Sequence, residues 1–261
     1  MIVVKFGGHA MKDENGDFAK AIAAAQDSGL SIVIIHGGGP QIDAALKAEQ
    51  ITSEFVGGFR VTTPEIFEVV ERVLAHEVGP GIAKSLQSAG VNAVALSGRT
   101  SESLIAEPLR KLIDGTPVDL GLVGIVSAVN PQAILNALKG GQVPVISPIA
   151  TDERFKGGLN VNADLAAAAI AGALDAHCLI IMTDVAGIYR SWPDASSLIS
   201  QISYTELDSL KATFAEGMAP KVQACLDAID GGASAVRIID GTDPSAFAAA
   251  LGNSGGTLVT R

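Results

Sequence analysis

Residues 31–40, Ser31-Ile32-Val33-Ile34-Ile35-His36-Gly37-Gly38-Gly39-Pro40, are the stretch that decides the fold. An apolar, β-branched run ends in three glycines, and a proline follows where the first turn of a helix tolerates one. The stretch predicts a buried strand over Ser31–His36, a tight turn, and a helix over Pro40–Ala48. We expect His36 to position the turn rather than to act as a base.

A second segment, Val3-Val4-Lys5-Phe6-Gly7-Gly8, repeats this design with a lysine near the end of the strand. Glycines let backbone N–H groups converge on an anion, and a helix N-terminus adds its dipole. In a parallel sheet both turns lie at the carboxyl ends of strands, where ligands bind. Either segment alone is equally well a plain tight turn. The two together, with Lys5 beside one of them, predict an anion site.

Short β-branched runs alternate with amphipathic helical stretches along most of the chain. The expected strands are Ile2–Phe6, Ser31–His36, Asn92–Leu96, Val143–Ile146, Leu179–Thr183 and Ala235–Ile239, and the expected helices are Asp17–Ser28, Pro40–Ala48, Pro131–Leu138, Asp164–Leu174 and Pro220–Ile229. Apolar strands separated by helices predict an α/β fold with a mainly parallel central sheet covered on both faces.

Two stretches, Thr52–Thr62 and Ser101–Val126, break this rhythm with Gly, Pro and mixed polar residues, and we expect hairpins or flaps there. No Pro/Ser linker or block of charge divides the chain. We expect a boundary between two lobes near residue 175, which gives an N-terminal lobe of residues 1–175 and a C-terminal lobe of residues 176–261.

The composition limits the class of protein. Hydrophobic residues make up 48% of the 261 residues and aromatic ones only 4%, so Ala, Val, Ile and Leu must fill the core. The net charge of -10 argues against a partner that is a nucleic acid or an anionic membrane. The first strand begins at Ile2 without a signal sequence, and no apolar run approaches the length of a membrane span. We therefore expect a cytoplasmic protein.

Cysteine and histidine give no metal pattern. Cys178 and Cys225 have neither disulfide nor metal-ligand spacing, and we expect buried free thiols. The four histidines lack the spacing of metal ligands, so a histidine-held metal is not predicted.

Two cations stand where an anionic ligand would explain them. Arg60 follows the flexible pair Gly57-Gly58, and a guanidinium binds a carboxylate bidentately. Lys221 falls in the first turn of a helix, where the helix dipole favours acids, so it calls for an anionic partner. The alternatives are a surface arginine in a hairpin and a solvated lysine.

The segment Asn160-Val161-Asn162-Ala163-Asp164 opens a predicted helix. Asn162 can be its N-cap and Asp164 a simple first-turn acid. The functional interpretation is that Asn160 donates to a substrate while Asp164 lies between lysines or near a metal. The chain has no Walker sequence, no protein-kinase catalytic loop and no nucleophile elbow.

Together these motifs resemble a known family. The chain is similar to the acetylglutamate kinases of the amino acid kinase superfamily in the order and spacing of Lys5-Phe6-Gly7-Gly8, His36-Gly37-Gly38-Gly39-Pro40, Gly58-Phe59-Arg60-Val61-Thr62, Asn160-Val161-Asn162-Ala163-Asp164, Thr183-Asp184 and Gly217-Met218-Ala219-Pro220-Lys221. The resemblance covers nearly the whole chain, and Trp192-Pro193-Asp194 looks most like the actinobacterial members.

The resemblance implies a three-layer αβα sandwich, the amino acid kinase fold, whose N-terminal lobe binds an acyl-amino acid and dimerises and whose C-terminal lobe binds ATP. Lys5, Lys221, Asp164, Gly8 and Gly38 would form the catalytic set. Gly38, Gly39, Arg60 and Asn160 would hold the acyl-amino acid. The nucleotide would be bordered by Asp184, Val185, Ala186, Gly187, Ile188, Tyr189, Thr213, Phe214, Ala215 and Met218, with Mg²⁺ held mainly by the ATP phosphates.

The chemistry agrees with this resemblance. A carboxylate acceptor with an ordinary pKa of about 4.3 is already deprotonated at neutral pH, so phosphoryl transfer needs no general base. Positioning and charge neutralisation then carry the reaction, and lysines, glycine amides and Mg²⁺ supply both. The resemblance thus implies ATP-dependent phosphorylation of the side-chain carboxylate of N-acetyl-L-glutamate, as in arginine biosynthesis.

Two rival functions share the fold. One is a kinase for another small carboxylate, such as N-acetylaminoadipate of lysine biosynthesis; the other is a non-catalytic amino-acid sensor. Retention of Lys5, Asp164 and Lys221 together speaks against the sensor. Arginine-inhibited members of the family are similar in carrying a helix before the first strand. Because the first strand here begins at Ile2, we expect a homodimer insensitive to arginine.

Overall fold

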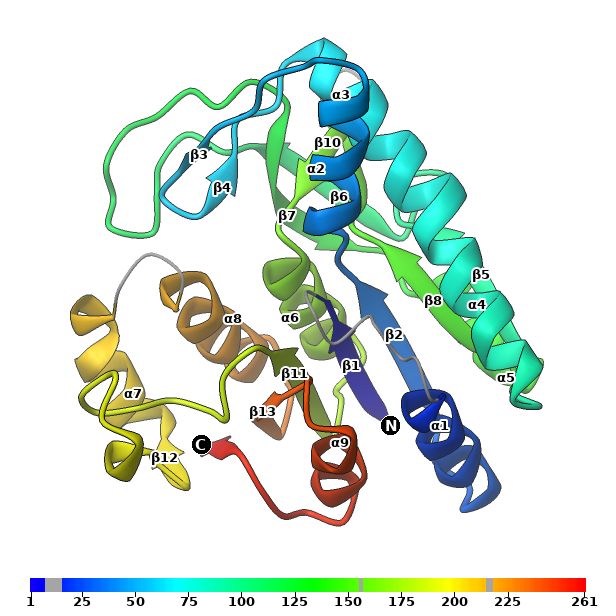
Figure 1. Ribbon diagram of the computed structural model, residues 1–261, viewed down its shortest axis with the longest axis vertical. Coiled ribbons are helices and arrows are strands. Elements are labelled where there is room, and N and C mark those ends of the chain that lie inside the picture. The colour runs from blue at the N-terminus through cyan, green and yellow to red at the C-terminus, as the bar shows by residue number, and fades with distance from the viewer. Residues whose placement is uncertain (8–15, 155–156, 215–217) are drawn as a thin grey trace.

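The computed structural model describes residues 1–7, 16–154, 157–214 and 218–261. Within these residues, the centre of the fold is an eight-stranded sheet with the order β12-β14-β13-β11-β1-β2-β8-β5 (Figure 1). Its strands are β1 (Ile2–Phe6), β2 (Ile32–His36), β5 (Ala93–Ser97), β8 (Val143–Ser147), β11 (Cys178–Thr183), β12 (Gln201–Ser203), β13 (Ala235–Asp240) and β14 (Thr257–Thr260).

The strands from β13 to β5 run parallel, and β14 pairs antiparallel with β13 at one side. This confirms the predicted α/β fold with a mainly parallel sheet. β1 pairs in register with both β2 and β11, because Ile2 lies opposite Ile32 on one side and Cys178 on the other. The carboxyl ends of these three strands therefore meet at one edge of the sheet, where ligands bind in parallel α/β folds.

Helices cover both faces of the sheet, as predicted. One face packs against α1 (Asp17–Asp27), α4 (Gly79–Ser88) and α9 (Pro244–Leu251), and the other against α5 (Gln132–Lys139), α6 (Ala163–Ala173), α7 (Tyr204–Leu210) and α8 (Ala219–Asp230). Side chains alternate along a strand, so Val4 and Phe6 enter the first core while Val3 enters the second. Lys5 follows the face of Val3 and so turns toward α6 and α8.

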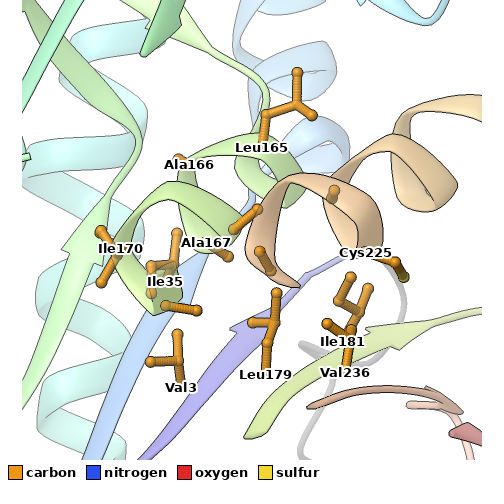
Figure 2. Packing of buried hydrophobic residues seen from close by; sticks show 14 of the residues in the cluster. Val3, Ile35, Leu165, Ala166, Ala167, Ile170, Leu179, Ile181, Cys225 and Val236 are labelled. Carbon is orange, nitrogen blue, oxygen red and sulfur yellow. The ribbon is translucent and has the colours of Figure 1, made fainter. Parts of the chain in front are cut away.

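The helices α6 and α8 lie side by side over the sheet, with Val3, Leu179 and Val236 beneath them (Figure 2). Small residues make this close approach possible. A Cβ placed on Gly172 in α6 would lie 2.8 Å from the Cα of Gly231 at the end of α8. This close approach lies at the C-terminal ends of the two helices.

Beyond the carboxyl edge of the sheet lies a second layer of short elements (Figure 1). It holds α2 (Gly39–Ala48), the antiparallel hairpin of β3 (Phe55–Val56) and β4 (Phe59–Arg60), and a small closed barrel of β6 (Leu104–Pro108), β7 (Val123–Val129), β9 (Ile149–Asp152) and β10 (Gly158–Val161). The hairpin within Thr52–Thr62 is confirmed. Ser101–Val126 does pair as β6 and β7, but its closure with β9 and β10 was not predicted.

One long helical rod, to which the sequence analysis assigns no element, crosses from this layer to the sheet. It consists of α3 (Pro64–Glu71), a π-helical segment (Arg72–Val78) and α4. In the described part of the chain, no helix has the length and apolar character needed to span a membrane. Both cysteines are free thiols; Cys225 is buried, as expected, whereas Cys178 is only half-buried.

Candidate active site

Three residues from distant parts of the sequence form one charged cluster. Lys5 Nζ at the end of β1 lies 3.0 Å from Asp164 Oδ1, and Lys221 Nζ from the first turn of α8 lies 3.2 Å from Asp164 Oδ2. Asp164 is only 4% exposed and Lys5 only 8%. The structure thus brings together the three side chains that the sequence analysis assigns to catalysis.

Asp164 is held in place by the start of α6. The side chain of Asn162 caps this helix, since its Oδ1 accepts from the N–H of Asp164 at 2.8 Å and of Leu165 at 3.3 Å. The N-cap interpretation of Asn162 is therefore confirmed. Asp164 is not a simple first-turn acid, because both of its oxygens are engaged by lysines.

Electrostatics favour an ionised Asp164. Burial by itself raises the pKa of this carboxyl, but the ammonium groups of Lys5 and Lys221 outweigh burial and hold the pKa below its ordinary value. Two lysines facing one carboxylate leave a net positive charge at the N-termini of α6 and α8. Both helix dipoles also favour a negative group there. The arrangement is therefore suited to an anion such as a phosphoryl group.

The glycine turns after β1 and β2 lie against this cluster. A Cβ on Gly7 would lie 2.9 Å from Lys5 Nζ, and one on Gly37 would lie 3.6 Å from the Cα of Gly7 and 4.0 Å from the Cβ of Ala163. A Cβ on Gly38 would collide with Leu74 at 2.5 Å. A side chain at Gly7 or Gly38 would displace the end of Lys5 or of Leu74, whereas the contacts at Gly37 are of ordinary length. Gly8, the other predicted phosphoryl contact, lies outside the described residues.

A pocket of about 160 Å³ opens beside the glycine turn of β2. All four residues predicted for the acid substrate line it, namely Gly38, Gly39, Arg60 and Asn160. Asn162 and Ala163, at the start of α6, line it too, so the pocket adjoins the lysine–aspartate cluster.

Arg60 in this pocket is buried, at 6% exposed, so it is not a surface arginine. Its Nη2 lies 2.7 Å from Asp43 Oδ1, its Nη1 donates to Ser53 Oγ at 2.8 Å, and its guanidinium lies 4.5 Å from the centre of the Phe55 ring. Asp43 is well exposed at the other end of the ion pair. The guanidinium of Arg60 is thus held in the pocket wall, where it can bind the carboxylate of a ligand.

Asn160 is hydrogen-bonded within the same wall of this pocket. Its Nδ2 donates to Thr62 Oγ1 at 3.1 Å, and that hydroxyl donates to the backbone carbonyl of Arg60 at 2.8 Å. This chain of hydrogen bonds couples β10 to β4, so the two predicted substrate-binding side chains are held relative to each other.

A second pocket, of about 500 Å³, lies at the start of α8. Five of the residues predicted for the nucleotide line it: Val185, Tyr189, Thr213, Phe214 and Met218. Asp184, Ala186, Gly187 and Ile188 do not line it. Ile188 is fully buried and its N–H donates to Thr257 Oγ1 at 2.8 Å, while Asp184 is exposed and accepts from Thr183 Oγ1 at 3.0 Å. Ala215 lies outside the described residues.

The second pocket also contains residues that the sequence analysis did not assign: Arg190, Ser191 and Trp192. Trp192 is 66% exposed, and its indole meets the Tyr189 ring edge-on at 5.1 Å. The turn that carries Trp192 is held by hydrogen bonds. Ser197 Oγ donates to Asp194 O at 2.6 Å, and Arg190 N donates to Ser197 O at 3.0 Å. Trp192 could have been predicted from the sequence, because it closely follows the segment predicted to border the nucleotide.

Over the ranges that the structure describes, no group of three His, Cys, Asp or Glu side chains is arranged to hold a metal ion.

Comparison with known proteins agrees with this geometry. The model of the "Amino acid kinase family" matches residues 1–240. An acetylglutamate kinase of Beutenbergia cavernae is 47% identical over 250 residues, covering 95% of this chain and 80% of that protein. A solved structure from Streptococcus mutans superposes with a TM-score of 0.82 at 30% identity, covering 99% of this chain and 98% of that one.

A carbamate kinase from Giardia superposes with a TM-score of 0.72 at 17% identity, covering 99% of this chain and 98% of that one. At this identity the likeness concerns the fold alone. The chain belongs to the amino acid kinase family, which confirms the predicted fold and family. Its membership in a family of kinases carries with it a phosphoryl donor of the ATP type and a small-molecule acceptor.

Proposed function

We propose that the chain transfers the γ-phosphoryl group of ATP to the side-chain carboxylate of N-acetyl-L-glutamate, as in arginine biosynthesis. The observation that carries the proposal is the buried cluster of Lys5, Asp164 and Lys221 at the carboxyl edge of the sheet. The curated relatives named acetylglutamate kinase, at 42–48% identity, support the choice of acceptor.

The position of the cluster fits in-line transfer between two sites. α6 begins with Asn162 and Ala163 in the wall of the smaller pocket, and Met218, just before α8, lines the larger one. We assign the smaller pocket to the acyl-amino acid and the larger to the nucleotide. A phosphoryl group passing between them would meet the ammonium groups of Lys5 and Lys221, which neutralise its charge in the transition state.

The remaining residues receive roles on the same basis. Arg60 would bind the carboxylate of the substrate that is not phosphorylated, and Asn160 would orient its acyl-amino group. The amides of Gly8 and Gly38 would donate to the phosphoryl oxygens, and Asp164 would hold both lysines in position. Mg²⁺ would arrive with the nucleotide, held by its phosphates, and would neutralise part of their charge.

We further propose that residues 1–175 and 176–261 act as two lobes, one for the acid and one for the nucleotide. The neighbouring strands β1 and β11 belong to different lobes, so the lobes share one sheet. A homodimer through the N-terminal lobe is proposed from the likeness to acetylglutamate kinases. Light scattering tests it, because a monomeric mass in solution would exclude it.

An assay of ADP release over a panel of acceptors tests the proposed function. The panel contains acetylglutamate, acetylaminoadipate, glutamate, aspartate and UMP at matched concentrations. We expect the highest kcat/KM with acetylglutamate. A preference for acetylaminoadipate would change the assigned acceptor but leave the assigned reaction, phosphorylation of a carboxylate, unchanged. Activity with none of the carboxylates would contradict the proposal.

A further inference from the structure

His36 is a buried titratable side chain beside the site, and the proposed reaction gives it no role. It lies at the end of β2, directly before the glycine turn, and is fully buried. Its Nδ1 lies 2.8 Å from the carbonyl oxygen of Gly37. A carbonyl can only accept, so the ring proton lies on Nδ1 and the lone pair on Nε2. Within the described residues, Nε2 has no hydrogen-bond partner.

The Nε2 side of the His36 ring packs against the helical rod. A Cβ on Gly79, the first residue of α4, would lie 2.9 Å from His36 Nε2. Gly79 donates its N–H to Leu74 O, five residues back, as the last bond of the π-helical segment. A glycine inside a helix costs about 1 kcal/mol relative to alanine. Its presence is explained here by the room that the imidazole takes.

The hydrogen bond of His36 is made to the peptide that also carries the Gly38 amide. The carbonyl of Gly37 and the N–H of Gly38 belong to one planar trans peptide and point in opposite directions. A turn of consecutive glycines has wide conformational freedom, so this peptide needs a partner to fix its plane. The N–H of Gly38 donates to no acceptor among the residues that the structure describes, and Gly38 lines the smaller pocket.

We propose that His36 is a positioning residue for phosphoryl transfer: by donating from Nδ1 to the Gly37 carbonyl, it aims the Gly38 N–H at the transferring phosphoryl group. The inference rests on the proposed function for the role of that amide. Burial lowers the pKa of His36 to about 4, although the bond to Gly37 opposes this, so the ring is a neutral donor at neutral pH. His36 takes no proton from the substrate in this role.

A matched pair of variants isolates the hydrogen bond. His36→Asn keeps an N–H donor where Nδ1 stands, whereas His36→Leu has nearly the same shape as Asn and no donor. Both leave the same space where the ring was. We expect kcat of the His36→Leu variant to be at least about 10-fold lower than kcat of the His36→Asn variant, with equal KM for ATP in the two variants. Equal kcat values for the two variants would overturn the inference.

A measurement on the unaltered protein covers the case in which the variants do not fold. Long-range ¹H–¹⁵N correlation NMR of the histidine rings reports which nitrogen carries the proton. We expect His36 to be protonated at Nδ1 and bare at Nε2 at pH 7. A proton on Nε2 would overturn the inference, because Nδ1 would then have nothing to donate.

The two experiments also separate this inference from the proposed function. If the unaltered protein phosphorylates no carboxylate, the proposed function fails, and the positioning role of His36 fails with it. If it does so with equal kcat in the Asn and Leu variants, only the role of His36 fails. Correct ring protonation together with a kinetic difference supports both.

Discussion

The ion cluster at Asp164 sets the first prediction at the scale of single residues. Lys5→Ala and Lys221→Ala each remove one preorganised charge from the site of the transferring phosphoryl group. We expect each to lower kcat by at least about 10²-fold, the scale found for loss of one preorganised donor. Steady-state kinetics measures this, with Lys139→Ala, an exposed lysine on α5, as the control. Near-normal turnover in either variant would remove that lysine from the catalytic set.

Arg60 allows binding to be separated from chemistry. Arg60→Lys keeps the charge but loses the planar fork that grips a carboxylate. We expect KM for acetylglutamate to rise at least about 10-fold while KM for ATP stays within about 2-fold. Arg72→Lys is the matched control, because Arg72 pairs on the surface with Glu49 and Glu77. A parallel rise in both KM values would move Arg60 to the nucleotide side.

His36 predicts a pH dependence of stability. Its pKa falls from an ordinary 6.5 to about 4 on folding, so the unfolded chain binds the proton more tightly. The stability associated with the neutral ring is present above pH 6.5 and is lost as the pH falls from 6.5 toward 4. The loss amounts to roughly 3 kcal/mol, at about 1.4 kcal/mol per pKa unit.

Denaturant unfolding between pH 7.5 and pH 4 measures this dependence. His36→Asn should lose less stability over the range than the unaltered chain, since it has no ring to protonate. The other histidines are shared by both proteins and cancel in the comparison. Parallel stability curves would show that His36 is not the buried neutral histidine described here.

At the scale of elements, sequence periodicity located six strands of the central sheet and missed β12 and β14 at one side of it. The predicted strands Ile2–Phe6 and Val143–Ile146 lie within a residue of β1 and β8, because apolar β-branched runs bounded by glycine have little choice of structure. The rod over residues 64–88 could not be predicted, since Gly79-Pro80-Gly81 lies in its middle. A proline inside a helix lacks an N–H and collides with the carbonyl four residues back. The π-helical segment just before Gly79-Pro80-Gly81 changes the spacing of the helical hydrogen bonds and so accommodates the proline.

The turn over residues 190–197 predicts a spectroscopic signal. It presents the sole tryptophan of the chain, Trp192, in the wall of the larger pocket, where a nucleobase could stack on the indole. We expect ADP to change the tryptophan fluorescence saturably and tripolyphosphate, which has no base, to leave it unchanged.

The same stacking predicts a kinetic effect. Trp192→Ala should raise KM for ATP about 5-fold or more, as expected for loss of about 1 kcal/mol of base stacking. KM for acetylglutamate should not change. Ile125→Ala, an exposed apolar residue of β7, is the control. If KM for ATP is unaffected in the Trp192 variant, the base binds elsewhere.

At the scale of the whole molecule, parallel pairing explains why the catalytic cluster was predictable. Lys5 lies near the end of a central strand, Asp164 begins α6, which packs over that strand, and Lys221 begins α8, which packs beside α6, so topology brings them together. The partners of Arg60 were not predictable. Asp43 and Ser53 lie in α2 and in the loop before β3, and nothing in their local sequence marks contact with a distant hairpin. Closure of the barrel was likewise hidden, because its pairs are short and mix parallel with antiparallel directions.

We propose that this molecule moves a phosphoryl group from ATP to a carboxylate using placed positive charges and no general base. Hydroxylamine trapping tests it most directly, because hydroxylamine converts an acyl phosphate to a hydroxamate and leaves phosphate esters intact. With acetylglutamate and MgATP, we predict one hydroxamate per ADP formed, with the yield abolished in the Lys5→Ala Lys221→Ala double variant. ADP release without hydroxamate, or hydroxamate formation that persists in the double variant, would contradict the claim.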